Sequence, residues 1–330
     1  MTMPPASSTI AATRESRTDW RDLAERHRVL LVSLFVLVFP QVFPFTALAV
    51  NILVYALYAL GFNLLFGYLG LLSFGHAALL GAGAYFCGIA IVHYALPWYA
   101  AIAIGVGGGM ITAAAIGVLA TRTRGIYFAM VTLALSQCVY YVFYQAVDWT
   151  GGENGLRGIN VREINIFGLR FDFIDPLTRY YVTAGFVIIA LVFLSRILAS
   201  PFGAVIEAVR ENDARAKASG YNVAHVRLIT FTLSGAFCGL AGALYALHLS
   251  TVPIEVMHYE MSGLAVMMCL LGGMGTFFGP FVGAAVFMIL EHLVSVWTVH
   301  WQLIVGAVFM VCVLFFPRGI WGTLTRIGRR

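Results

Sequence analysis

The sequence predicts an all-α polytopic membrane protein, a helical bundle of about ten transmembrane helices. Its 330 residues are 61% hydrophobic and only 11% charged, whereas soluble domains carry about 25% charged residues. The charges gather in a few gaps between long apolar runs, as in loops that join membrane helices. Because about 20 apolar residues cross a bilayer as a helix, the candidate spans are residues 29–45, 47–66, 76–95, 98–120, 126–147, 179–198, 228–249, 257–273, 279–296 and 300–316.

The first apolar run follows a polar segment, residues 1–28, which contains Pro, Ser, Arg, Asp and Glu and does not resemble a signal peptide. We therefore expect this run to stay in the membrane as an anchor, separated from the second run by a tight turn at Pro40 and Pro44. The domain organisation that follows is a cytoplasmic N-terminal segment (1–28), a transmembrane domain (29–316) and a cytoplasmic C-terminal tail (317–330).

Arginine placement orients the spans, because cytoplasmic loops carry an excess of Lys and Arg. Ten spans put four arginine-containing regions on one side, the cytoplasm: residues 14–28, 122–124, 196–227 and 318–330. The loop 148–178 balances its arginines with Asp and Glu and falls outside. The eighth candidate span is short and flanked by glycines. If it is re-entrant, nine spans remain and the termini lie on opposite sides.

The charged interruption at residues 199–227 predicts a helix that stays out of the bilayer. Ser200 is a good N-cap, Pro201 suits the first helical position and Gly220 suits the C-terminal stop. The apolar side chains fall on one helical face, at i, i+3, i+4 and i+7: Phe202, Val205, Ile206 and Val209. This amphipathic pattern indicates a docking element for a cytoplasmic partner, with this face buried against either the partner or the bundle. A plain solvated loop is the alternative.

Two glycine-rich segments, residues 61–85 and 272–285, share similar spacing. Small residues let helices approach closely, and irregular backbone within a membrane must be satisfied by protein or line a cavity. The first segment therefore predicts either helix packing with a turn or part of a substrate path. The shared spacing would also suit an internal repeat, which is common in transporters.

Polar residues inside the apolar runs are few, and such residues suggest functional roles because they are costly in a bilayer. As candidates for a translocation pathway we single out Asn63, Ser73, His76 and Glu291. Glu291 is followed by His292, but adjacent helical positions do not face each other.

Several chemistries lack their sequence motifs. The sole lysine is Lys217, so no P-loop is present, and no zinc, CxxC or nucleophile-elbow motif occurs. The five cysteines all lie in apolar runs and are interpreted as small buried apolar residues: Cys87, Cys138, Cys238, Cys269 and Cys312. We expect no enzyme activity, no metal site and no cofactor in this chain.

Distinctive motifs lie at residues 61–85, 151–156, 200–212, 270–280 and 316–322. In combination, these motifs resemble the permease subunits of branched-chain amino-acid ABC transporters of the LivM type, and the resemblance spans roughly residues 46–322.

The resemblance implies a permease in a bacterial inner membrane, embedded in lipid, that imports branched-chain or related small amino acids. Its expected partners are a second, paralogous permease subunit, cytoplasmic ATP-binding subunits that hold ATP and Mg, and an external solute-binding protein. No nucleic acid is expected. The residues implied to couple to the ATP-binding subunit are Phe202, Gly203, Glu207, Ala208, Arg210, Glu211, Asn212 and Gly220. The usual glycine four residues after Ala208 is missing.

Alternatives remain at this stage. Similar permeases carry urea, amides or aromatic acids. A proton-coupled secondary carrier that uses Glu291, or a structural membrane subunit of a larger complex, would also suit the apolar bundle.

Overall fold

The computed structural model describes residues 30, 32–34, 36–37, 40, 45–161, 163–166, 169–173, 175–298, 300–316 and 319–327. The N-terminal segment and most of the first candidate span, 29–45, lie outside the described residues.

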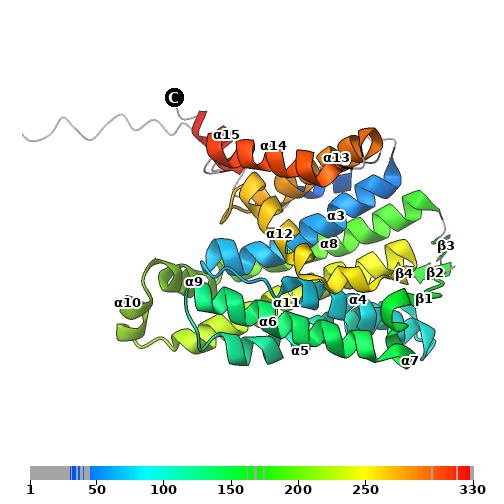
Figure 1. Ribbon diagram of the computed structural model, residues 1–330, viewed down its shortest axis with the longest axis horizontal. Coiled ribbons are helices and arrows are strands. Elements are labelled where there is room, and N and C mark those ends of the chain that lie inside the picture. The colour runs from blue at the N-terminus through cyan, green and yellow to red at the C-terminus, as the bar shows by residue number, and fades with distance from the viewer. Residues whose placement is uncertain are drawn as a thin grey trace, which may run out of the picture.

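The described residues form a bundle of long helices that run roughly along one direction (Figure 1). Seven are long and apolar enough to cross a membrane, and two apolar helices are shorter. The bundle helices are α3 (Thr46–Asn63, continued by a π-helical turn at Leu64–Tyr68), α4 (His76–Val92), α5 (Trp98–Ala120), α6 (Ile126–Gln145), α8 (Pro176–Ala199), α11 (Val223–Leu249), α12 (Tyr259–Gly272), α13 (Gly279–Trp297) and α14 (Trp301–Phe315). They match the second to tenth candidate spans in order, which confirms the all-α polytopic fold.

Glycine allows the centre of the bundle to pack closely. α11 packs against α3, α4 and α5, and α4 also packs against α5, while α3 is buried along nearly its whole length. A Cβ atom on Gly239 of α11 would lie 2.9 Å from the Gly105 carbonyl oxygen of α5. Such contact leaves no room for a side chain, so the glycines here set the distance between the helices.

The outer helices present apolar side chains outward. Ile111, Met130, Ile189 and Leu314 are exposed on α5, α6, α8 and α14. A soluble monomer rarely exposes so much apolar surface, and hydrocarbon is the solvent that suits it. Of the cysteines, three are buried, but Cys138 is exposed and Cys312 is half-buried. The interpretation of all five as buried was therefore wrong for these two, which lie on α6 and α14 near the edge of the bundle.

The two ends of the bundle carry different structures (Figure 1). One end holds short elements built from the loop 148–178: α7 (Val147–Thr150), β1 (Leu156–Arg157), β2 (Glu163–Ile166), β3 (Leu169–Asp172) and a 3-10 turn at Gly152–Asn154. β1 pairs with β4 (Thr251–Val252), and β2 pairs with β3, both antiparallel. The opposite end holds α9 (Pro201–Glu211) and α10 (Asp213–Ala218).

The amphipathic segment differs from the single helix that its sequence predicts. Asn212 adopts an extended backbone between α9 and α10, and its side-chain oxygen accepts a hydrogen bond from the Arg215 amide at 3.0 Å. Asn212 is thus the N-cap of a second helix. Ser200 occupies the N-cap position of α9, but its hydroxyl donates to the Ile197 carbonyl at 2.6 Å and caps nothing. Gly220, with φ of +89°, follows α10 as the expected stop.

Candidate functional site

Two breaks between helices meet inside the bundle. The first separates the turn ending at Tyr68 from α4, and the second separates α12 from α13. Asn63, at the end of α3, joins the helical run before the first break to the second break: its side-chain amide donates to the Thr276 carbonyl at 3.0 Å and accepts from the Gly275 amide at 2.9 Å. The structure therefore brings the two glycine-rich segments into contact. A structural repeat between them stays a prediction.

Side chains from neighbouring helices satisfy the backbone of the first break. The Phe74 amide donates to Thr132 Oγ1 of α6 at 3.1 Å. Ser262 Oγ of α12 donates to the Phe74 carbonyl at 2.8 Å and accepts from the Ala77 amide at 2.9 Å. Ser73 Oγ accepts from the Gly75 amide at 3.1 Å. Irregular backbone within a membrane would require such partners, and this break has them.

His76 links α4 to α11 at the start of α4. Its Nε2 atom lies 2.9 Å from Ser234 Oγ, which itself donates to the Gly61 carbonyl at 2.6 Å. A hydroxyl has one proton to donate, so the imidazole Nε2 is the donor to Ser234. The ring is fully buried, with Phe62 at 4.7 Å between centroids. This bond joins two central helices.

The four pathway candidates separate into two places. Asn63, Ser73 and His76 are buried at or beside the first break and hydrogen-bonded within the protein. Glu291 is half-buried, twelve residues after Gly279 on α13, or about 18 Å along the helix axis. The structure does not bring Glu291 to the breaks.

The coupling candidates divide by face. Ile206 and Val209 are buried, and Phe202 and Val205 are half-buried, all packed against the bundle core. Of the two alternatives left open by the sequence, partner or bundle, the apolar face of α9 therefore packs against the bundle. The residues left exposed are Glu207, Ala208, Arg210, Glu211, Asn212 and Gly220. Gly203 is buried, and a Cβ there would collide with the Leu198 carbonyl.

Arg210 reaches from α9 to both breaks. Gly70 (φ of +79°) and Gly275 (φ of +73°) each belong to one break. A Cβ on Gly70 would lie 3.1 Å from Arg210 Cγ, and a Cβ on Gly275 would lie 3.1 Å from Arg210 Nη1. The aliphatic stem thus crosses the first break and the guanidinium lies against the second. Sequence reasoning missed this contact, because nothing in the local pattern links residues so far apart.

An ion pair holds α10 on the bundle. Asp213 pairs with Arg227, which is buried at the start of α11, and lies 3.9 Å from the Arg124 guanidinium in the α5–α6 loop. A buried charge needs such a partner. Asp213 therefore ties α10 to two other segments at this end of the bundle.

The C-terminal region, expected to be a tail, contains a helix. α15 (Gly319–Ile327) packs against α12 and α13. Trp321 lies 4.8 Å from the Phe278 ring, and a Cβ on Gly319 (φ of +73°) would collide with the Gly273 backbone. α15 thus covers the second break.

At the two breaks, the described side chains join helices by hydrogen bonds and packing, and they form no arrangement suited to covalent catalysis. Within the described ranges, no group of three or more His, Cys, Asp or Glu residues could hold a metal ion. Exposed polar groups on α9 lie at one end of the bundle, beside two broken helices.

Comparison with known proteins gives the family. The family model described as "Branched-chain amino acid transport system / permease component" matches residues 45–314. The high-affinity branched-chain amino acid transport system permease protein LivM of Escherichia coli (strain K12) is 28% identical over 89% of this chain and 75% of its own length. A probable branched-chain amino acid transport permease protein LivM of Methanocaldococcus jannaschii is 24% identical over 77% of this chain and 82% of its own length.

More distant relatives carry other names. The ribose import permease protein RbsC of Haemophilus influenzae is 30% identical over only 35% of this chain and 38% of its own length. No solved structure matches the chain. Because the family model covers most of the sequence, including every bundle helix and both breaks, the chain belongs to the branched-chain amino acid transport system permease family and is a transport component, not an enzyme.

Proposed function

We propose that this chain is the permease subunit of an ABC importer for branched-chain or related small amino acids. ATP hydrolysis in separate cytoplasmic subunits drives the transport. The proposal rests on the two faces of α9. Its apolar face packs against the bundle, whereas Glu207, Ala208 and Glu211 stay exposed at the bundle's end. An exposed polar face on a helix too short to span the membrane suits contact with a soluble subunit.

The rest of the machine follows from the two ends of the bundle. ATP-binding subunits, with their ATP and Mg, would seat on α9 and α10. A solute-binding protein would dock at the opposite end, where β1 to β4 and α7 lie (Figure 1). A second, paralogous permease subunit would complete the path for the solute across the inner membrane, with both termini of this chain in the cytoplasm.

Transport follows from a change in helix arrangement. Closure of the ATP-binding subunits would push α9, which packs against α8, α11 and the turn Leu64–Tyr68. That push biases the bundle between outward and inward access. This movement would reach the end of α3 and the first break. We propose that the side chains there, Asn63, Ser73 and His76, neighbour the translocation pathway.

The substrate assignment rests on the relatives, two of which are named for branched-chain amino acids. Urea, amides and aromatic acids are the alternatives among similar permeases. Glu291 as the proton site of a secondary carrier is the alternative from another class.

The test is uptake of radiolabelled leucine into proteoliposomes. These would contain this chain, its paralogous permease subunit, the ATP-binding subunits and the solute-binding protein. We expect uptake only with ATP and Mg inside, and no loss on adding a protonophore. Leucine uptake that does not depend on ATP but is lost on adding the protonophore would overturn the proposal in favour of the Glu291 carrier.

A charge reversal tests the docking face. Glu207→Arg should lower leucine uptake severalfold and weaken co-purification of the ATP-binding subunits, because the reversed charge faces the proposed partner. Glu153→Arg, at the opposite end, is the matched control and should leave co-purification unchanged. Full co-purification and uptake with Glu207→Arg would contradict docking at this face.

A further inference from the structure

Arg210 lies at the meeting point of two helix C-termini. The turn Leu64–Tyr68 ends the α3 run at the first break, and α12 ends at Gly272 at the second. The last carbonyls of a helix lack intrahelical partners and carry a partial negative charge. A cation is therefore favoured where two such ends converge. The Arg210 guanidinium lies near that place, because its Nη1 atom is 3.1 Å from the position that a Cβ on Gly275 would take, although the residue as a whole is exposed.

The shape of the contact depends on glycine at both breaks. Gly70 and Gly275 have positive φ and no side chain, so the arginine stem can lie within van der Waals distance of the first break while its head reaches the second. Among the described residues, the Arg210 guanidinium makes no ion pair that would hold it elsewhere. Asn63 binds the end of α3 to the second break beside this contact.

We propose that Arg210 is a positioning residue that transmits displacement of α9 to both broken helices at once. It acts by packing its stem on Gly70 and placing its charge against the two helix C-termini. The proposal deepens the ABC permease function and rests on it. It gives Arg210 a bundle-facing role, distinct from the partner-facing role of Glu207 and Glu211.

The test separates coupling from transport itself. In the ATP-driven proteoliposomes, we would measure ATP hydrolysed per leucine imported for Arg210→Lys and Arg210→Met. Both variants retain an unbranched stem, but only lysine retains the charge. A helix-terminus charge interaction corresponds to about a two- to fivefold change in an equilibrium, so Arg210→Met should raise the ratio by about that factor. Arg210→Lys should stay near the wild-type ratio.

Arg122→Met is the matched control. Arg122 is an exposed arginine of the loop between α5 and α6, outside α9, α10 and both breaks, so its loss removes the same charge without touching either break. Its ratio should not change. Equal ratios for wild type, Arg210→Met and Arg122→Met would overturn the proposal while leaving ATP-driven uptake intact.

Hydrogen exchange supplies a second measurement that does not depend on turnover. In the purified complex, Arg210→Met should speed amide exchange in both breaks, residues 69–75 and 273–278, because the helix C-terminus before each break loses the same charge. Faster exchange at neither break, or at only one, would contradict the joint role. If Arg210→Met fails to fold, it will show fast exchange throughout α3 and α11, and Arg210→Lys then becomes the test. Protection of both breaks in Arg210→Lys would support the role. Unprotected breaks in a folded Arg210→Lys variant would overturn it.

Discussion

At the scale of single residues, Asn63 shows how one amide side chain can set the geometry of two distant segments. Its donor and acceptor match one carbonyl and one amide of the second break. Both partners are backbone groups that no helix satisfies. A buried polar group left without a partner costs about 1–3 kcal/mol. The two hydrogen bonds of Asn63 therefore help to stabilise the conformation of the second break.

Replacing Asn63 with alanine should therefore lower the stability of the protein by about 1–3 kcal/mol. The Gly275 amide and the Thr276 carbonyl would lose their partner at a half-buried site. The shift in thermal unfolding of the detergent-solubilised protein measures the effect. Asn51→Ala on the same helix is the control, because the structure gives Asn51 no side-chain hydrogen bond among the described residues. Equal melting temperatures for both variants would mean that the Asn63 bonds contribute nothing.

Sequence alone marks Asn63 as unusual but cannot name its partners. A polar residue in an apolar run is visible in composition, whereas its hydrogen bonds join residues more than two hundred positions apart. The same holds for Arg210, which in sequence is one charge among several on an amphipathic helix. Its contact with Gly70 and Gly275 depends on how three helices cross. Composition predicts that such residues matter, and packing decides how.

At the scale of elements, the spans were predictable because length and hydropathy determine them. The candidate span 98–120 coincides with α5, Trp98–Ala120. The division of the segment 199–227 into α9 and α10 was not predictable in the same way. The helical pattern continues through Asn212 in sequence, and only the capping bond to the Arg215 amide and the Asp213–Arg227 ion pair favour the break.

The glycines of α5 provide a test of close helix packing. A Cβ on Gly109 would lie 2.6 Å from both the Gly235 carbonyl oxygen and Gly239 Cα, whereas a Cβ on Gly107 would have no neighbour within 4 Å. Gly109→Ala should destabilise the protein by about 1–3 kcal/mol through overpacking. Gly107→Ala, two residues away on the same helix, should cost nothing, since alanine favours helix. Thermal unfolding of the two purified variants compares them, and a neutral Gly109→Ala would show that α5 and α11 can separate freely.

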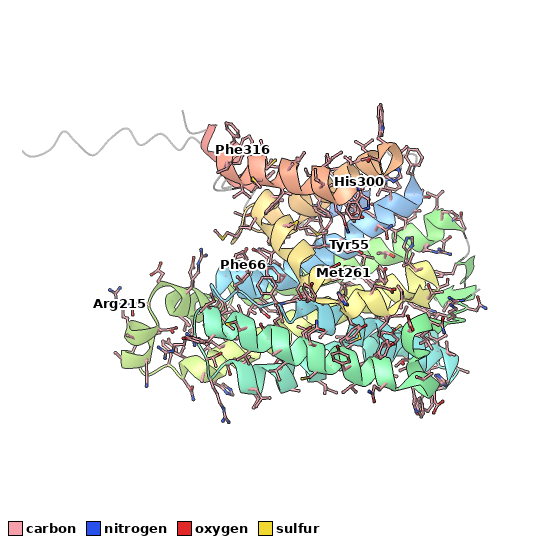
Figure 2. The ribbon with its side chains drawn as sticks, viewed as in Figure 1. Tyr55, Phe66, Arg215, Met261, His300 and Phe316 are labelled. Atoms are coloured by element: carbon pink, nitrogen blue, oxygen red, sulfur yellow. The ribbon has the colours of Figure 1, made fainter. Side chains whose placement is uncertain are left out.

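At the scale of the whole molecule, the centre of the bundle is closely packed, and the proposed docking surfaces lie at its ends. Central helices are held by glycine contacts and a few side-chain hydrogen bonds, and Tyr58 adds one from α3 to the Met261 carbonyl at 3.2 Å. Figure 2 shows Tyr55 and Met261 near the middle of the molecule, far from Arg215 at the end where α9 and α10 lie. The push on α9 that we propose would therefore have to cross this distance to reach the centre.

The orientation of these ends in the membrane is the prediction that the arginine pattern makes most directly, and cysteine labelling tests it. In a background with the two reachable cysteines, Cys138 and Cys312, replaced by serine, single cysteines would be introduced as Glu153→Cys, Lys217→Cys, Ser8→Cys and Gly328→Cys. Because the 148–178 end is expected outside, an impermeant maleimide should label only Glu153→Cys on intact cells. The other three should react after permeabilisation, since ten spans place both termini on the same side of the membrane as α10, the cytoplasm. Labelling of either terminus on intact cells would contradict ten spans and support nine, with the short helix α12 re-entrant.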